Sequence, residues 1–228
     1  VEGLPSEIVH APGAIDRMTY EGRADVHDDG SAALDLTMTF EGNRAIAWRN
    51  AFDQIPQAKV DDFVERELVA PSFDGGHVRE LKVDSTALDR PLVMHLRVEV
   101  PQFVKAQGGG TWSVHPPFLP NLGQLATLPS RHTPILRRAA WHAEVRVHVT
   151  LPDAFKLPSA TPRGEERSGD AVIAVRDALG PHSIDFDRTV EVPAGRVQPG
   201  DDYAAWQTFV RAADALLSHD VMLDKAVK

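Results

Sequence analysis

Strict alternation of apolar and polar residues is the feature that most limits how this chain can fold. Between positions 92 and 100 every second residue is Leu, Met or Val, and between positions 143 and 151 every second residue is Ala, Val or Leu. A side-chain period of two is that of a β-strand with one face on a core and the other in water. Both runs therefore predict half-buried antiparallel strands.

Shorter runs with the same period extend this prediction over most of the chain. The sequence Asp28-Asp29-Gly30 separates two of them and is typical of a hairpin turn. The period is irregular near Arg188, within a strand that we expect at 183–192. The other predicted strands are 15–27, 33–41, 78–84, 111–114, 171–176 and 220–224.

The region after the second predicted strand departs from this period. Trp48, Phe52 and Ile55 recur at helical spacing, and the apolar residues of 60–68 do so again after Pro56. Proline interrupts a helix because it lacks the amide hydrogen and clashes with the preceding turn. We therefore predict two short helices in the first half of the chain, separated at Pro56.

A third helix is predicted near the C-terminus, where Asp201 or Asp202 can act as the N-cap. Its apolar stripe consists of Tyr203, Trp206, Phe209, Val210, Ala213, Leu216 and Leu217. So broad a stripe must be docked on the sheet. Replacing Trp206 or Phe209 by Ala is then expected to cost about 3 to 5 kcal/mol. The predicted fold class is mostly β (α+β): an antiparallel β-sandwich of roughly nine to eleven strands with two short helices in the first half and one C-terminal helix.

Charge and cysteine content exclude several classes of function. The formal net charge of -9 leaves no basic field for the phosphate backbone of a nucleic acid. The chain contains no cysteine, and therefore no disulfide, thiolate nucleophile or cysteine-ligated metal. No apolar run reaches the ~20 residues that span a bilayer. We expect no cofactor, no nucleic-acid partner and no membrane span.

Ten histidines invite a metal site, but their spacing argues against one. His142 and His148 share one side of a predicted strand, where six residues separate them by about 20 Å, too far for one metal ion. His95 could join either of them only through a strand pairing that the sequence does not establish. Adjacent acids and the run Gly108-Gly109-Gly110 fit turns and surfaces, and no nucleophile motif occurs. We expect no catalytic and no metal-binding residues.

The four tryptophans are candidates for a sugar-stacking platform, although large aromatic residues more often belong to a core. Trp112 and Trp141 discriminate between the two interpretations. Inward rings favour a scaffold, whereas coplanar exposed rings favour a sugar site.

A set of motifs in the second half resembles a known family. Ser130-Arg131-His132-Thr133-Pro134-Ile135 leads into a long alternating strand that ends in Leu151-Pro152, followed by Leu157-Pro158. The last helix contains Tyr203-x-x-Trp206-x-x-Phe209-Val210. This order is similar to the C-terminal β-rich region that follows the papain-like core in bacterial transglutaminase-like proteins of unknown function. The hairpin and the Gly42-x-x-Ala45-x-x-x-Arg49 helix also fit, so the likeness covers most of the chain.

The resemblance implies an accessory domain that has no catalytic residues of its own. In that family an upstream core supplies Cys, His and Asp, and this sequence has no cysteine onto which the nucleophile could map. Such proteins are commonly exported, which implies a periplasmic or extracellular location. The chain begins with Val1 rather than Met, and we expect a piece of a longer protein. We also expect no thiol-dependent transamidase or protease activity and no stoichiometric zinc.

The predicted role is a non-catalytic domain that packs on the upstream catalytic domain of the same polypeptide; the alternative is a glycan- or peptide-binding β-sandwich module. Residues 1–228 are predicted to form one domain, with a division into 1–115 and 135–228 around a linker at 116–134 as the alternative. The segment Pro116 to Pro134 has no strand or helix period. Its residues Phe118, Leu119 and Leu122 are the predicted interface, unless the loop plugs its own sandwich.

Overall fold

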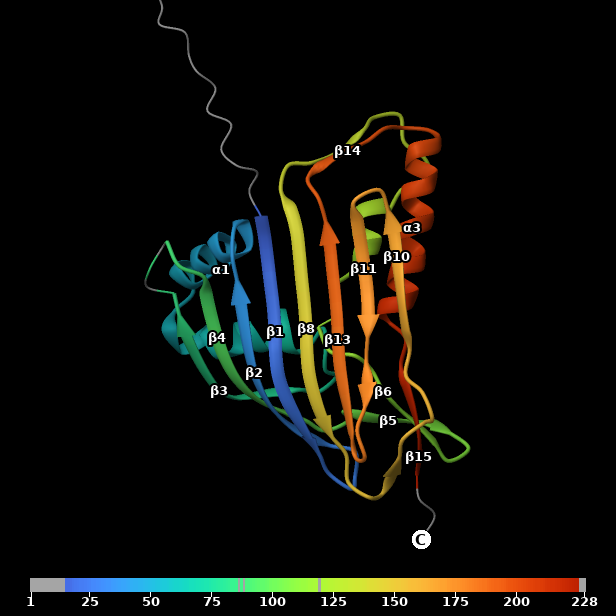
Figure 1. Cartoon of the computed structure of the whole chain (residues 1–228). Coiled ribbons are helices and arrows are strands. Elements are labelled where there is room, and N and C mark those ends of the chain that lie inside the picture. Colours follow the sequence, from blue (N-terminus) through green and yellow to red (C-terminus); the bar gives the residue numbers. More distant parts are fainter. Residues whose placement is uncertain (1–14, 86, 88, 119, 226–228) are drawn as a thin grey trace, which may run out of the picture.

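The computed structural model describes residues 15–85, 87, 89–118 and 120–225. These residues are mostly β, and the predicted fold class is confirmed: the sheets are largely antiparallel, with two α-helices in the first half and one near the C-terminus (Figure 1). The strands are β1 (Ile15–Val26), β2 (Ala32–Phe40), β3 (His77–Asp84), β4 (Leu92–Val100), β5 (Val104–Gly108), β6 (Thr111–Val114), β7 (Ile135–Arg137), β8 (Ala140–Thr150), β9 (Phe155–Lys156), β10 (Arg163–Ser168), β11 (Ala171–Arg176), β12 (Ala178–Leu179), β13 (Ser183–Val192), β14 (Gly195–Val197) and β15 (Val221–Lys225). The helical segments are α1 (Asn43–Gln54), η1 (Gln57–Lys59), α2 (Val60–Val64), η2 (Glu65–Val69), η3 (Leu122–Ala126) and α3 (Asp201–Leu217).

The described strands outnumber the nine to eleven that were expected, because several short ones were not predicted. Among the unpredicted strands, β7, β9, β12 and β14 have two or three residues each, while β5 and β10 have five and six. A run of two or three residues cannot show a period of two, and β5 and β10 are too polar to show an apolar face. Four strands, β4, β6, β11 and β13, have the predicted bounds.

A nine-stranded sheet forms the main layer of the molecule. Its order is β10-β11-β13-β8-β1-β2-β4-β3, and β12 pairs with β13 at its side. The pairs are antiparallel except β1 with β8, which run parallel from Ile15 opposite Ala140 to Asp25 opposite Thr150. This one parallel pair was not predicted. This pair joins residues of 1–115 and 135–228, the two segments of the alternative domain division, in one sheet. Whether either segment folds alone stays a prediction.

One face of this sheet is apolar and covered. Helices α1 and α2 cover the side with β1 to β4, and α3 covers β10 and β11 at the opposite side (Figure 1). The four-stranded sheet β5-β6-β15-β9 lies across the end at the foot of the view in Figure 1. Apolar side chains from all these elements form one continuous core. None of the helices in the described part of the chain is long and apolar enough to cross a membrane.

Helix α3 is docked on the sheet, as its stripe predicted. Six of its residues are buried, and the Tyr203 hydroxyl donates a hydrogen bond to the Leu128 carbonyl at 2.5 Å. The predicted N-cap was wrong: the cap position is Gly200, and Asp201 and Asp202 lie in the first turn. Gly200 adopts φ +81°, a conformation that favours glycine over Asp.

Candidate functional site

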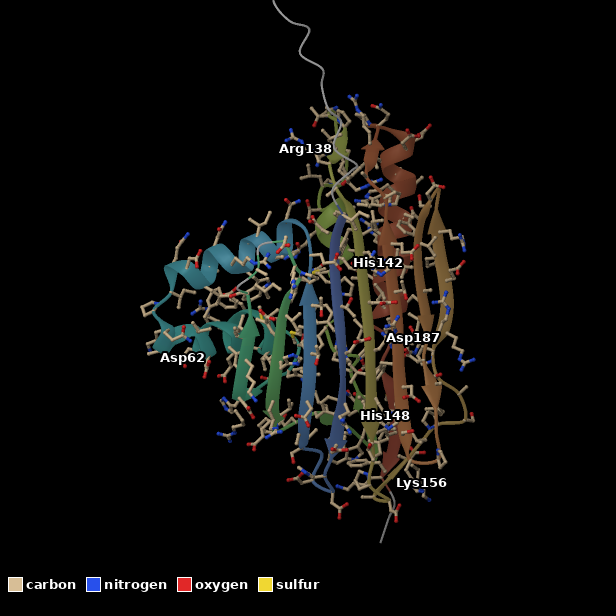
Figure 2. The ribbon with its side chains drawn as sticks, turned by 60° about the vertical axis from the view of Figure 1, so that its left-hand side comes forward. Asp62, Arg138, His142, His148, Lys156 and Asp187 are labelled. Atoms are coloured by element: carbon tan, nitrogen blue, oxygen red, sulfur yellow. The ribbon has the colours of Figure 1, made fainter. Side chains whose placement is uncertain are left out.

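The uncovered face of the large sheet carries rows of charged side chains. One row of directly paired residues crosses six strands and consists of Glu80, Arg97, Asp35, Arg23, His148 and Asp185. Within it, Arg97 lies 3.1 Å from Asp35 and 3.5 Å from Glu80. His148 lies 2.6 Å from Asp185, and Figure 2 shows this histidine on β8. Opposite charges mostly alternate along the row, so its members stabilise one another.

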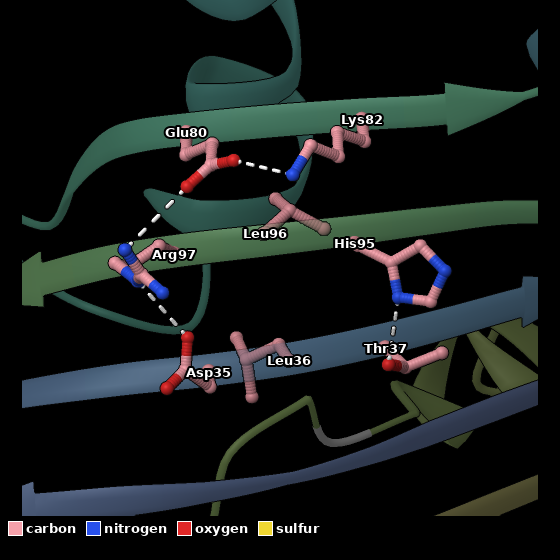
Figure 3. Close-up of a pocket in the computed structure, with 8 residues that line it drawn as sticks. All are labelled: Asp35, Leu36, Thr37, Glu80, Lys82, His95, Leu96 and Arg97. Carbon is pink, nitrogen blue, oxygen red and sulfur yellow. Dashed lines mark hydrogen bonds and ion pairs between the residues drawn. The ribbon is translucent and has the colours of Figure 1, made fainter.

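The hollow on this face is shallow and its side chains already have partners. It measures about 180 Å³ and lies over Leu36 and Leu96, whose side chains are buried (Figure 3). Glu80 contacts Lys82 at 2.6 Å, and Thr37 contacts His95 at 3.0 Å. The hydrogen bond from Lys82 lowers the pKa of Glu80 below its usual value. A surface whose charges are mutually satisfied is a weak candidate for ligand binding.

A larger crevice lies on the inner face, between the two helical covers. Its volume is about 460 Å³, within the range of ligand sites. Its walls come from β1, β8, α1, η2 and the segment around η3 and consist of Asp16, Met18, Tyr20, Arg44, Glu67, Leu68, Pro71, Ser72, Phe118, Pro120, Asn121, Gln124, Leu125, Trp141 and Ala143. A second hollow of about 270 Å³ shares five of these residues and extends toward Trp48 and Phe63. The two together form an elongated groove, which we take as the candidate site.

An aromatic stack forms one wall of the crevice. The rings of Tyr20 and Phe118 lie parallel, with centroids 4.8 Å apart, and Phe73 meets Phe118 edge-on at 5.3 Å. Phe118 adopts φ +53°, a left-handed conformation that costs a non-glycine residue energy. Such strain persists only where the surroundings hold it, and it concentrates at functional sites. Burial raises the pKa of Tyr20 from 10.0 to about 12, which keeps this wall uncharged.

Polar groups without partners surround the stack. The indole Nε1 of Trp141 is buried and has no hydrogen-bond partner among the described residues. Arg44, Asn121 and Gln124 likewise form no hydrogen bond or ion pair through their side chains within the described part of the chain. Among the described residues, Glu67 forms an ion pair with Arg66 at 2.9 Å. The crevice therefore offers donors, acceptors and both signs of charge beside an aromatic wall.

The structure places two of the three predicted interface residues inside the chain's own core. Phe118 is 6% exposed and Leu122 is 0% exposed, whereas Leu119 lies outside the described residues. The segment also contains η3, whose first turn is held by the carboxylate of Asp214 on α3, 2.9 Å from the Leu122 amide. The exposure that an interface needs is absent for Phe118 and Leu122 in this conformation. Phe118 nevertheless takes part in the candidate site, as a wall of the crevice.

The histidines that were weighed as metal ligands pair with other groups. Strands β1 and β2 separate β4 from β8, so His95 lies on a strand remote from His142 and His148. His142 is 3.7 Å from Glu191, across the β8–β13 pair. No group of three metal-ligating side chains occurs within residues 15–85, 87, 89–118 and 120–225.

Trp112 and Trp141 lie in different sheets and form no shared platform. Trp112, on β6, meets Phe155 at 68° and has the Lys225 ammonium 4.5 Å above its ring. Trp141, on β8, faces the crevice. The two half-buried rings therefore do not build a coplanar sugar-stacking surface.

A buried ion pair beside α3 was missed by the sequence analysis. Arg188 is 1% exposed and Asp177 is 0% exposed, with Nη2 2.5 Å from Oδ2. Burial raises the pKa of Asp177, although the guanidinium opposes this shift. One signal was available: Arg188 falls on the inward side of an alternating strand, between Phe186 and Val190. A cation at such a position requires a buried acidic partner.

Comparisons with known proteins give little further information. No protein-family model and no curated protein matches the chain. A structure of a caspase-8/P35 complex is similar at 10% sequence identity and a TM-score of 0.20, over 91% of this chain and 96% of that chain. A mutated baculovirus P35 after caspase cleavage is similar at 9% identity and a TM-score of 0.20, over 91% of this chain and 99% of that chain. TM-scores this low support no argument about fold or function.

Proposed function

We propose that this chain is a non-catalytic accessory domain that binds an extended polypeptide segment of a neighbouring domain in the inner crevice. The observation that supports this function is the elongated groove of about 460 Å³, with its continuation of about 270 Å³. Several polar groups of its wall, among them the Trp141 indole, have no hydrogen-bond partner among the described residues. A peptide presents amide groups and mixed side chains along its length. Those groups match the aromatic wall and the unpaired Trp141, Arg44 and Gln124.

The chemistry of the crevice favours binding over catalysis. Its described lining residues include Ser72 but no histidine and no cysteine, so the serine hydroxyl has no imidazole base among them. On the resemblance of Ser130 to Ile135 and of the last helix, the neighbouring domain is proposed to be a transglutaminase-like catalytic core. The same resemblance favours a periplasmic or extracellular location.

A glycan in the crevice is the competing ligand. Sugar sites typically stack rings on exposed, flat aromatic surfaces. Trp112 and Trp141 do not provide such a pair, since they lie in separate sheets. The peptide is therefore the ligand that we propose, and an oligosaccharide is an outcome that the test must be able to detect.

Indole NMR signals provide the test, because the chain has only four tryptophans. The indole Nε1 atoms of Trp141 and Trp206 are both buried and have no hydrogen-bond partner among the described residues. Of these two side chains, Trp141 lines the crevice and Trp206 does not. Each signal is assigned with a Trp→Phe variant. Pools of blocked tetrapeptides that contain one aromatic residue are then titrated into the ¹⁵N-labelled protein. We expect the Trp141 indole signal to move while the Trp206 signal stays fixed.

Variants of the crevice complete the test. Arg44→Gln and Glu67→Gln should weaken peptide binding without changing the melting temperature, because both side chains are exposed. Movement of the Trp141 signal only with maltotetraose or chitotetraose would favour the glycan module instead. A Trp141 signal that stays fixed with peptides and sugars alike would refute the crevice as a ligand site.

A further inference from the structure

The charges of this acidic chain are distributed unevenly along its sequence. The stretch from Val100 to Ala143 contains no Asp or Glu, although the whole chain contains 33. Part of this stretch forms β7, which pairs with β14 in a two-stranded ribbon. Residues 192–200, which include β14, also contain no acid. Figure 2 shows Arg138, directly after β7, at the end of the molecule opposite Lys156.

The two faces of this ribbon have different roles. Its inner face packs on α3: the Arg137 guanidinium lies 4.5 Å above the ring of Trp206, and its Nε donates to the Pro193 carbonyl at 3.0 Å. Ile135 and Val197 on the same side belong to or contact the core. The ribbon is therefore held in place by buried contacts rather than projecting loosely from the molecule.

The outer face exposes an apolar side chain between two cations. Leu136 is 62% exposed, which is the largest exposed fraction of any large apolar side chain in the described part of the chain. Leu136 pairs directly with Arg196 on β14. Arg138 follows β7 directly in the chain, and its side chain is also exposed. Arg138 and Arg196 are exposed and form no hydrogen bond or ion pair with any other described residue. Leu136, Arg138 and Arg196 together are the arginine-leucine patch.

We propose that the arginine-leucine patch binds an acidic peptide segment of a partner protein that places an apolar side chain on Leu136. Carboxylates accept the paired hydrogen bonds that a guanidinium offers, and two unpartnered arginines supply this geometry. The exposed Leu136 side chain adds an apolar contact, so a peptide with an apolar residue between its acids should bind more tightly than one with charges alone. This binding is separate from the crevice, whose lining includes none of the three patch residues.

A narrow peptide fits the patch better than an anionic membrane does. Glu191 is exposed and Glu144 is half-buried on the neighbouring part of the uncovered face. Two more carboxylates, those of Asp201 and Asp202, follow β14 closely in the chain. A flat anionic surface that touched the patch would also approach these carboxylates and the net charge of -9. A peptide can reach the ribbon alone, so the partner is assigned as a polypeptide segment.

Fluorescence anisotropy of a short labelled peptide tests the proposal. The probe contains Asp and Glu on both sides of a Leu, and its comparison peptides carry Lys at the acidic positions or Ser in place of the Leu. We expect the intact chain to prefer the acidic Leu peptide over both. The doubly substituted variant Arg138→Glu with Arg196→Glu should bind it about tenfold or more weakly, because two attractive charge contacts become repulsive. Leu136→Ser should weaken binding about threefold or more.

The matched control is Arg211→Glu, which reverses an exposed arginine on α3 without touching the patch. It should leave the affinity unchanged. Equal affinity for the acidic and the Lys peptides, or equal affinity of the patch and Arg211 variants, would overturn the proposal. Cosedimentation with phosphatidylserine vesicles that is lost in the doubly substituted variant, in the absence of peptide binding, would assign the patch to a membrane and would equally overturn it.

Discussion

At each side of the large sheet a helix covers the apolar face, and a buried arginine donates hydrogen bonds that hold this helix in place. The two arginines come from different elements and bond to different groups. Arg188 projects from β13 and reaches the end of α3, donating to the carbonyls of Leu217 and His219. Arg49 projects from α1 itself and donates to the carbonyls of Ser85, Ala87 and Arg90 at 3.3, 3.0 and 2.7 Å.

The difference lies in how each buried charge is compensated. Arg188 pairs with the carboxylate of Asp177, and it also donates to the carbonyl of Leu217, the last residue of α3, where the helix dipole favours a cation. Arg49 is held by carbonyl dipoles of the turn between β3 and β4, and it is less deeply buried, at 9% exposed. The first arrangement joins a helix to the sheet, whereas the second joins a helix to a turn.

The two helices also differ in how deeply their side chains are buried. Helix α3 buries six residues, while α1 buries Ala45 and Arg49 and leaves Trp48 and Phe52 half-buried. The half-buried aromatic side of α1 also borders the groove of the candidate site. Of the two helices, α3 is therefore the more deeply buried, and α1 is the one whose aromatic side borders the groove.

Removal of Asp177 should have the largest effect. Asp177→Ala leaves the Arg188 guanidinium buried without its carboxylate, so we expect the free energy of unfolding to fall by about 3 to 5 kcal/mol. Urea denaturation measures this loss. The control is Asp35→Ala, which removes an exposed ion pair with Arg97 and should cost less than about 1 kcal/mol. Equal losses in the two variants would contradict the role of the buried pair.

Truncation of aromatic residues compares the two helices directly. Phe209→Ala or Trp206→Ala on α3 should cost about 3 to 5 kcal/mol, because each side chain is buried. Phe52→Ala on α1 should cost about half as much, since only part of that ring leaves water on folding. Thermal and urea denaturation of the three variants gives the ranking. Unchanged stability in both α3 variants would show that α3 is not part of the core.

Loss of the Arg49 side chain should have a smaller and more local effect. Arg49→Met removes three hydrogen bonds and should cost about 1 to 3 kcal/mol. Amide hydrogen exchange should speed up in α1 and around Arg90, while α3 keeps its protection, because the two covers contact different strands. Arg49→Lys retains a hydrogen-bond donor, so its stability and its exchange rates should lie between those of the unsubstituted protein and of Arg49→Met. Faster exchange spread evenly over α3 would be the contrary result.

Ionisation of Tyr20 should have the smallest effect. Its pKa is about 12 in the folded chain and 10.0 when unperturbed, so the neutral form is favoured by folding. The resulting contribution to stability is complete below pH 10, and it is lost as the pH rises through about 12. Tyrosinate absorbance of the native protein should show a component near pH 12 that disappears in Tyr20→Phe. A titration unchanged by Tyr20→Phe would place the phenol outside the buried wall.

The local periodicity of the sequence was sufficient for the long elements. Strands β4, β11 and β13 and the stripe of α3 were predicted because burial of a strand or helix face repeats every two or 3.6 residues, and the repeat is visible within one segment. The break between α1 and the next helical segment at Pro56 was predicted for the same local reason. The turn chemistry of Gly200 was missed, since the two acids beside it are also good caps.

The candidate site was not predictable in this way. Tyr20, Phe118 and Trp141 meet in the crevice only because β1 pairs with β8 in parallel and the segment before η3 folds back over them. The absence of a period in Pro116 to Pro134 left two interpretations open, an exposed interface or a plug of the chain's own sheet, and Phe118 and Leu122 are buried. An aperiodic segment can bury side chains wherever neighbouring elements leave a space, and that space is not encoded locally.

The sequence by itself determined which residues form strands and helices and which side of each is apolar, because those properties depend on neighbours along the chain. Only the tertiary structure decided that Arg188 meets Asp177, that β1 runs parallel to β8, and that a crevice remains between the two covers. Such pairings depend on the relative energies of many long-range arrangements, each with its own loop entropy and buried surface. A local period contains no information about that competition.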